Sequence, residues 1–424
     1  MSRDEHDSLP LPLLAEYLRH TSFWDDWVPF LLDFPPFAER YQELLRLATE
    51  HRHADLELVA WDAPAAPGLL AELLALPQPQ RLREVEADSR YRSWCLCHLL
   101  LRRCLEVTPD DPQAGEQLAE VAGLIAEHLP SKTCGHEPLA ELKALAWAHR
   151  GNALRAQCEL RQAATCFNRA FSNLGPLPAN RASRAEIFAM HGGLLRDQRD
   201  FEGARISLQR ALELFAGSGS PAGAARPLLI LASLDYEVGE ARAAVEHTRR
   251  ALALLDISSQ PRLFAKAAFN LATFLARAGS YTEARLELTR HRAFLAQHST
   301  SVDQIRLRWC EAIIARGLDE LAEAADAYQE ARARFIEKGL GYYSALVTLE
   351  LSTLYLEQGQ TGVVRDLVRE MLPIFRAQDI QREVRAVLIL FQNAVLQETI
   401  TVELARQLSG RLQKAGQNPS FHQD

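Results

Sequence analysis

The chain has 424 residues, of which 48% are hydrophobic and 24% are charged, and its formal net charge is −8. This composition is typical of a folded globular protein and excludes a disordered or collagen-like chain. The acidic balance argues against a general nucleic-acid binder, because affinity for the phosphate backbone requires a basic surface. The chain is also too long for one ordinary core of roughly 100–200 residues, so several domains or a repeat array are expected.

The N-terminal segment gives no sign of secretion. Residues 1–14 carry charges of both signs and lack the cationic start and the apolar run of a signal peptide. No stretch approaches about 18 uninterrupted apolar residues, so we expect no membrane-spanning helix. The seven cysteines have an odd count and do not form a small-domain framework. We therefore expect a cytoplasmic protein with reduced thiols.

Residues 1–90 are predicted to form a helical N-terminal subdomain or a cap. The segment 23–37 is rich in Trp, Phe and Pro, and it is followed by an expected helix at 37–52 and a proline-rich connection at 63–80. Bulky aromatic residues are usually core, whereas an aromatic patch that nothing in the chain covers would be a partner surface. No helix-turn-helix motif with a basic second helix is found here.

Residues 91–142 are predicted to form a degenerate helical repeat, with helices at 92–106 and 114–129. From about residue 143 onward, apolar residues at i, i+3, i+4 and i+7 predict further helices of 12–18 residues. In these helices small residues recur at intervals of 41, 40, 40, 40 and 40 residues, at Ala163, Ala204, Ala244, Ala284, Ala324 and Val364. A second row lies seven residues downstream, two turns along the same face, at Ala170, Ala211, Ala251, His291, Ala331 and Met371.

The helix before each of these has its own small position, twelve residues before the first row, at Gly151, Gly192, Ala232, Ala272, Ala312 and Ser352. Small residues on both helices predict antiparallel pairs that approach closely. Gly239, Gly279 and Gly359 lie five residues before the first row, where a turn between helices favours a residue that tolerates positive φ. Gly317 comes two residues earlier in its repeat, which predicts a longer turn there.

This pattern resembles the tetratricopeptide repeat. The match is most complete at Trp147, Gly151, Leu154, Ala163, Phe167 and Ala170, which follow the W…LG…Y…A…F…A signature. The period is about 40 rather than 34 residues, as in longer tetratricopeptide-like arrays of bacteria, and the LG pair is intact in none of the repeats. The alternative is an unrelated helical solenoid or bundle.

The resemblance implies an all-α fold, a right-handed superhelix of antiparallel helix pairs with a helical N-terminal subdomain. Six repeats would occupy residues 143–378, because the spacing recurs six times. Residues 379–424 would supply C-terminal capping helices at 379–397 and 400–416 and a short tail.

The sequence contains no P-loop, GxGxxG, GxSxG or HExxH motif. The strongest candidate metal cluster comprises Cys95, Cys97, His98 and Cys104, with Cys134 and His136 further on. A C-x-C pair in a helix places its two sulfurs on roughly opposite faces, so we interpret these residues as small buried thiols. We therefore expect no enzyme activity, no metal and no cofactor.

In a tetratricopeptide superhelix the first helix of each pair lines a concave groove. The resemblance assigns to this groove Asn152, Arg155, Arg196, Tyr236, Lys266, Phe269, Asn270, Arg277, Arg306, Trp309 and Arg316. It also implies that Lys266 and Asn270 correspond to carboxylate-gripping residues of peptide-binding tetratricopeptide domains. The arginines could hold the carboxylates of a peptide, or they could pair with Asp235, Glu237 or Glu311 on adjacent helices. The residues leave both interpretations open.

The leading hypothesis is a non-enzymatic adaptor that binds a protein or peptide with acidic segments, within a regulatory or defence assembly. A peptide-sensing regulator, whose superhelix changes shape on ligand binding, is one alternative. An enzyme with a site between the N-terminal subdomain and the repeats is the other. The partner is expected to be neither nucleic acid in general nor a membrane, and the sequence fixes neither its identity nor the oligomeric state.

Overall fold

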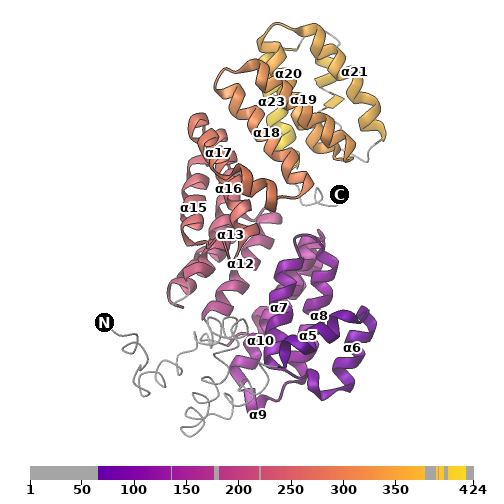
Figure 1. The fold of residues 1–424 in the computed structure, drawn as a ribbon, viewed down its shortest axis with the longest axis vertical. Helices are drawn as coiled ribbons and strands as arrows, with labels where there is room; N and C mark the ends of the chain where they lie inside the picture. Colours follow the sequence, from indigo (N-terminus) through magenta and orange to yellow (C-terminus); the bar gives the residue numbers. More distant parts are fainter. Residues whose placement is uncertain are drawn as a thin grey trace, which may run out of the picture. The chain divides into compact units, whose positions relative to one another are not determined.

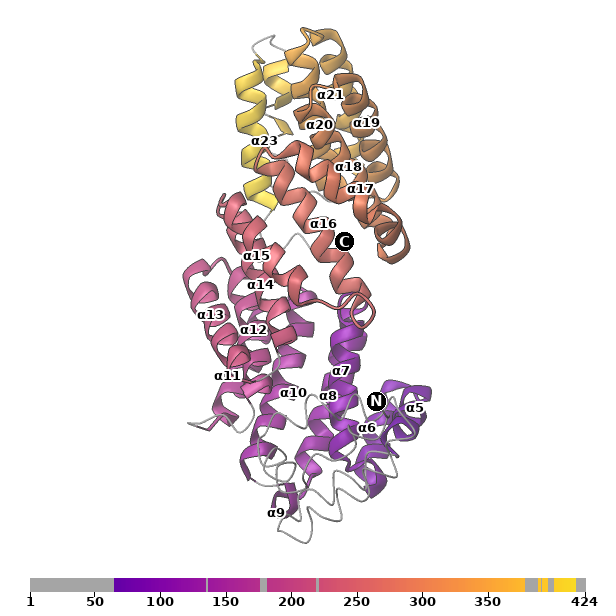
Figure 2. The same ribbon diagram turned by 60° about the vertical axis from the view of Figure 1, so that its left-hand side comes forward.

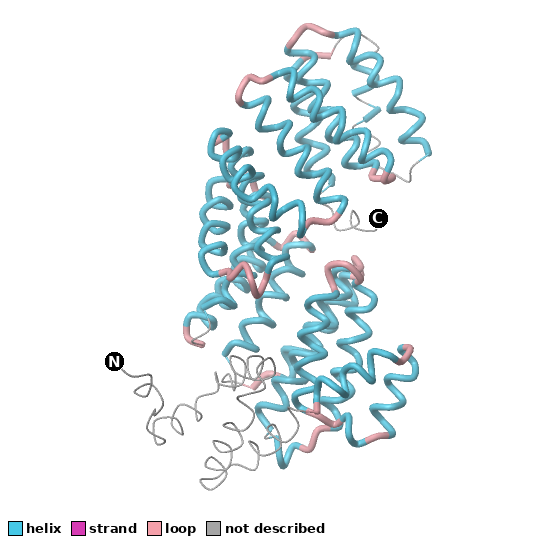
Figure 3. Tube along the Cα trace, viewed as in Figure 1, coloured by secondary structure: helices cyan, strands magenta, loops and turns pink. Residues whose placement is uncertain are grey.

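The computed structural model of the chain describes residues 65–134, 136–175, 181–218, 221–377, 388–389, 391–395 and 400–416. Every regular element in these residues is a helix, and no strand occurs among them (Figure 3). None of the described helices is long and apolar enough to cross a membrane. Contacts divide the chain into an N-terminal region, Met1–Ile230, and a C-terminal region, Leu231–Asp424, with the division inside helix α14. The predicted all-α class is confirmed.

The segment predicted as a proline-rich connection is helical instead. It forms α5 (Ala66–Ala75) and the start of α6 (Gln78–Ala87), and each helix has its proline in the first turn. Proline is tolerated there because first-turn N–H groups have no partner within the helix. The aromatic segment 23–37 and the helix expected at 37–52 lie outside the described residues.

Helices α5 and α6 share a core with the helices that follow them. Leu69, Leu73 and Val85 are buried in the same cluster as apolar side chains of α7 (Trp94–Val107) and α8 (Pro112–His128). The helices α7 and α8 occupy the two segments predicted for the degenerate repeat. Short elements, η1 (Ser89–Tyr91) and α9 (Ser131–Cys134), connect these helices to their neighbours.

Six helix pairs follow in chain order (Figures 1 and 2). They are α10 (His136–Ala156) with α11 (Leu160–Asn173), α12 (Arg181–Asp197) with α13 (Phe201–Ala216), α14 (Ala225–Glu237) with α15 (Ala241–Leu254), α16 (Pro261–Arg277) with α17 (Tyr281–His298), α18 (Ser301–Gly317) with α19 (Leu321–Glu337), and α20 (Gly341–Glu357) with α21 (Thr361–Ala377). A last helix, α23 (Val402–Gly416), packs against α20.

Side chains at the helix starts satisfy backbone N–H groups that the helices leave without partners. Ser93, Asp111 and Asp200 each accept a hydrogen bond from a backbone N–H two or three residues into the helix that follows. Thr300 and Asp303 form a reciprocal capping box at the start of α18. These local signals fix where several of the helices begin.

The small residues lie where paired helices meet, as predicted. Ala163, Ala204, Ala244, Ala284, Ala324 and Val364 are all fully buried. A Cβ atom added to Gly151 would lie 2.9 Å from Phe167 Cε2, and one added to Gly192 would lie 2.6 Å from Leu208 Cγ. A larger side chain at either glycine would therefore force the two helices apart.

All six turns within the pairs have the same conformation. Positive φ angles, from 63° to 90°, recur at Cys158, Arg199, Gly239, Gly279, Asp319 and Gly359. The longer turn predicted beside Gly317 is wrong, because α18 ends at Gly317 and α19 begins at Leu321, the same interval that separates α16 from α17. Asp319 takes the positive-φ position of that turn, and aspartate is among the few non-glycine residues that tolerate it.

Candidate functional site

In the N-terminal region the first helix of each pair turns one polar face away from its paired second helix. On α10, Gly151 meets Phe167 of α11, whereas His149 and Arg155 contact residues of α12. We call this surface the first-helix face. It is formed by His98 on α7, His149, Asn152 and Arg155 on α10, Glu186, Gly193, Arg196 and Asp197 on α12, and Arg226 on α14.

Two predicted groove residues of this region, Arg155 and Arg196, converge on the carboxylate of Asp197, and a third, Asn152, contacts Arg155. Arg155 Nη1 donates to Asp197 Oδ2 at 2.5 Å, and its Nε donates to Asn152 Oδ1 at 3.1 Å. Arg196 donates to Asp197 Oδ1 through Nε at 3.0 Å and Nη2 at 2.6 Å. Burial acts to raise the pKa of Asp197, but the charges of Arg196 and Arg155 outweigh it and lower that pKa. Asp197 thus fixes both guanidinium groups in place.

Gly193 on α12 has no side chain and lies beside Arg155 of α10. A Cβ atom there would make only ordinary contacts, 3.7 Å from Arg155 Nε and 4.0 Å from Ile230 Cδ1. The side chains of α10 and α14 therefore approach each other across α12 at this position. Gly193 itself is buried beneath these two side chains.

A second group on the first-helix face, which we call the histidine cluster, comprises His98, His149, Glu186 and Arg226. His149 Nε2 lies 3.3 Å from Glu186 Oε1, and only 2% of the His149 side chain is exposed. Burial acts to lower the pKa of His149, but the nearby Cys104 thiol and the Glu186 carboxylate raise it to about 10. Burial lowers the pKa of His98 to about 4. At neutral pH the pair is therefore an imidazolium beside a carboxylate, while His98 is neutral.

Arg226 completes the histidine cluster from α14. Burial lowers the pKa of its guanidinium, and the charges of Glu186 and Glu106 oppose that effect. Although Arg226 is half-buried, it forms no hydrogen bond, ion pair or ring contact with any residue that the structure describes. His149, Glu186 and Arg226 are not among the residues predicted from the sequence, where His98 is a candidate only as a metal ligand.

In the C-terminal region, two predicted groove residues bind a single carboxylate. Arg277 Nη2 donates to Glu350 Oε1 at 3.0 Å, and Trp309 Nε1 donates to Glu350 Oε2 at 2.7 Å. The Arg277 guanidinium also lies 5.8 Å from the centre of the Trp309 ring. Burial acts to lower the pKa of Arg277, but the charge of Glu350 outweighs it and raises that pKa. These residues form an internal polar network.

Arg316 and Arg306 also have partners within the chain. Arg316 Nη2 donates to Glu357 Oε1 at 2.7 Å, and Arg406 on α23 donates to the same atom at the same distance. Arg306 donates to the Tyr343 hydroxyl at 2.5 Å and lies over its ring.

The remaining predicted residues lie on α14 and α16. Tyr236 stacks on Phe274 with ring centroids 5.1 Å apart, and Phe269 packs against the core. Asn270 is half-buried and Lys266 is exposed. A carboxylate-gripping role for Lys266 and Asn270 stays a prediction.

Several of the predicted groove arginines pair with acidic residues of the chain. Asp235 lies 2.6 Å from His247 Nδ1, and Glu311 pairs with Arg292 and Arg308. The partners of Arg155, Arg277 and Arg316 include Asp197, Glu350 and Glu357. Arg155 and Asp197 are 42 positions apart, and Arg316 and Glu357 are 41 apart. A separation of about one repeat places two residues on adjacent first helices, and this signal could have been found in the sequence.

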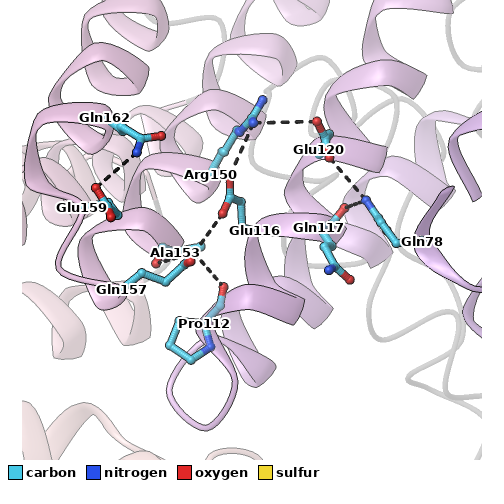
Figure 4. Close-up of polar contacts among 10 residues, drawn as sticks. All are labelled: Gln78, Pro112, Glu116, Gln117, Glu120, Arg150, Ala153, Gln157, Glu159 and Gln162. Atoms are coloured by element: carbon cyan, nitrogen blue, oxygen red, sulfur yellow. Dashed lines mark hydrogen bonds and ion pairs between the residues drawn. The ribbon is translucent and has the colours of Figure 1, made fainter. Parts of the chain in front are cut away.

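A further polar seam joins α6, α8 and α10 (Figure 4). Arg150 lies 3.4 Å from Glu116 and 3.7 Å from Glu120. Gln157 donates to Glu116 Oε2 at 2.9 Å, and Gln78 donates to Glu120 at 3.3 Å. Every contact in this seam links two helices of the N-terminal region, so we interpret it as a structural feature.

The predicted cysteines are free thiols, and Cys95, Cys97 and Cys104 are buried in the core. Burial raises the pKa of the Cys97 thiol well above its usual range. Within the described ranges no group of three or more His, Cys, Asp or Glu side chains is placed to hold a metal ion. A cavity of about 180 Å³ lies elsewhere, between α17, α18 and α19, and it includes no predicted groove residue.

The fold and this surface together define a tetratricopeptide-like helical-repeat protein. No protein-family model matches the sequence, and no curated protein is significantly similar to it. Among 37 matching chains of solved structures is a Rap protein in complex with Competence and Sporulation Factor. It is 13% identical, with a TM-score of 0.52, and the match covers 77% of this chain and 94% of that one. At this identity the similarity shows the fold alone.

Two other solved structures match with lower TM-scores. Aspartyl phosphate phosphatase F from Bacillus subtilis is 12% identical, with a TM-score of 0.49, and the match covers 88% of this chain and 96% of that one. The pilF protein of Pseudomonas aeruginosa is 16% identical, with a TM-score of 0.38, covering 56% and 90% of the two chains.

Proposed function

We propose that the chain is a non-catalytic scaffold of the cytoplasm that binds an extended segment of a partner protein along the first-helix face of the N-terminal region. The observation that carries this proposal is the network of Asn152, Arg155, Arg196 and Asp197. Asp197 positions both guanidinium groups from neighbouring helices, at 2.5 and 2.6 Å. Donors that are already held in place lose little conformational entropy when a ligand binds.

The C-terminal region supports this assignment by contrast. There, Arg277 and Trp309 are bound to Glu350, and Arg316 shares Glu357 with Arg406 of α23. A ligand at Arg277 would have to displace Glu350, whose side chain is only 8% exposed, and breaking such a buried pair is costly. We therefore assign partner binding to the N-terminal region.

The solved Rap structure gives independent support from the fold. That protein is complexed with Competence and Sporulation Factor, so the shared fold can hold a separate factor. Extending this to the present chain, we propose an adaptor role in a regulatory or defence assembly. The basic side chains of the first-helix face favour a partner segment that carries carboxylates.

A displayed peptide library tests the proposal. Peptides are selected on the immobilised full-length protein, and their affinities are then measured for the double variant Arg155→Gln, Arg196→Gln. We expect at least a tenfold loss of affinity, because each arginine loses its charge-assisted donors. The matched control is Arg161→Gln, Arg210→Gln, which removes two exposed arginines from the second helices α11 and α13. Equal affinities for both double variants, with unchanged far-UV circular dichroism, would contradict the proposal.

A further inference from the structure

The histidine cluster draws on four helices that lie far apart in the sequence. His98 comes from α7, His149 from α10, Glu186 from α12 and Arg226 from α14. His149 and Glu186 are joined at 3.3 Å. The charge of Arg226 acts on Glu186, and the charges of Glu186 and His149 act on His98. The cluster lies on the same face as the proposed partner surface.

Arg226 differs from other buried or half-buried arginines of the first helices. Arg155 is bound to Asp197 at 2.5 Å, Arg184 to Glu141 at 2.9 Å, and Arg277 to Glu350 at 3.0 Å. Arg226 makes no such pair with any described residue, although its guanidinium is removed from much of the solvent. A cation that loses water without gaining a partner costs free energy. An incoming carboxylate would remove that cost.

The carboxylates near Arg226 do not supply this partner. Glu186 is hydrogen-bonded to His149, whose raised pKa keeps it an imidazolium at neutral pH. Glu106, on the other side, is half-exposed and pairs with Arg103 at 2.9 Å. The positive charge of Arg226 is therefore not balanced within the cluster. His98, a neutral ring packed 5.5 Å from Trp94, lies within reach of the charges of Glu186 and His149 and carries one N–H donor.

We propose that the histidine cluster binds one carboxylate group of an acidic partner segment, with Arg226 as the cation and His98 as a second donor. This inference rests on the proposed function and names the chemistry of the ligand. Asn152 and Arg155 lie three and six positions after His149 on α10. Six helical residues span about 9 Å, which an extended peptide covers in about three residues. The remainder of the segment would therefore reach the Asp197 network.

A pair of synthetic peptides tests this directly. The probes are acetylated and amidated hexaglutamate and hexaglutamine, titrated calorimetrically into the full-length protein at neutral pH and low salt. The site variant is Arg226→Gln. The control is Arg250→Gln on α15, which removes the same charge from an exposed arginine.

We expect the wild-type protein and Arg250→Gln to bind hexaglutamate at least tenfold more tightly than hexaglutamine. Arg226→Gln should lose most of that preference. Arg226→Lys should retain part of it, because lysine keeps the charge but cannot bind a carboxylate in the bidentate geometry of arginine. An undiminished preference in Arg226→Gln, or no preference in the wild-type protein, would overturn the inference.

Two further measurements separate the possible failures. The melting temperature of Arg226→Gln should stay unchanged or rise, because the lost cation has no partner among the described residues; a large fall would assign Arg226 a structural role and overturn the inference. The library-selected peptides separate this inference from the proposed function. If Arg226→Gln binds them like the wild-type protein while Arg155→Gln, Arg196→Gln does not, the carboxylate site is wrong and the partner surface stands. If Arg226→Gln and the double variant Arg155→Gln, Arg196→Gln both bind the selected peptides like the wild-type protein, the proposed function fails as well.

Discussion

Gly317 lies directly against the ring of Tyr281, and a Cβ atom on Gly317 would be 2.3 Å from Tyr281 Cδ1. Gly317 ends α18 and Tyr281 begins α17, so the contact joins two successive repeats of the C-terminal region. The glycine that the sequence suggests as a turn residue is therefore a packing residue. Its small size, rather than its conformational freedom, is what the fold uses.

Gly317→Ala should destabilise the protein. The added methyl group would overlap the Tyr281 ring, and overpacking of this kind typically costs about 1–3 kcal/mol. The free energy of unfolding, measured with urea, should fall by that amount. Gly410→Ala in α23 is the matched control, because a Cβ there meets nothing within 4 Å; it should stabilise the helix by up to about 1 kcal/mol. A neutral Gly317→Ala would show that the contact can relax freely.

The uniform turns predict opposite effects for two substitutions at equivalent positions. Asp319 has a φ of 64° and Gly279 a φ of 83°. Asp319→Gly should stabilise the protein by a few tenths of a kcal/mol, because glycine adopts positive φ without steric cost. Gly279→Ala should destabilise it by about 1 kcal/mol, since its Cβ meets no neighbour and only the backbone is strained. Melting temperatures that move in the same direction would be inconsistent with a shared turn conformation.

Glu350→Gln should be strongly destabilising. Glu350 has 8% of its side chain exposed and binds Arg277 and Trp309, so removing its charge leaves Arg277 without a counter-ion. Breaking such a pair costs about 3 kcal/mol. Glu330→Gln, at a side chain that is 47% exposed, should cost less than about 1 kcal/mol. Chemical denaturation compares the two, and equal costs would mean that the Glu350 network contributes little to stability.

The His149–Glu186 pair should make stability depend on pH above neutrality. The pKa of His149 is raised to about 10 in the folded protein, against an ordinary value near 6.5. Its contribution is therefore fully present below about pH 6.5 and declines as the pH rises to about 10. The lowered pKa of Glu186 acts at lower pH, because its contribution is lost only as acid protonates the folded carboxylate.

The difference in unfolding free energy between the wild-type protein and His149→Gln should consequently shrink between pH 7 and pH 10. Urea unfolding at several pH values measures it. The exposed His128 on α8 supplies the control variant His128→Gln, which removes a histidine outside the His149–Glu186 pair. A constant difference for His149→Gln would mean that this histidine is not charged in the fold.

Much of the helix arrangement follows from the spacing of small residues. Ala163 and its successors predict the paired helices because a helix can approach another closely only where side chains are small. The ion-pair partners of the arginines are harder to predict from the sequence. Arg277 pairs with Glu350, which lies 73 positions further along the chain, nearly two repeats away. No periodicity in the sequence favours that partner over Asp235 or Glu311.

The amino-acid sequence by itself determined the all-α class, the paired helices and their small contact residues, because these depend on local periodicity and on side-chain size. The tertiary structure decided which charges are neutralised. Ion pairs depend on distances of a few ångströms between helices, and these distances placed Asp197 between two arginines and left Arg226 without an ion-pair partner in the part of the chain that the structure describes. The overall charge of −8 conceals this difference, because only the fold brings particular charges together.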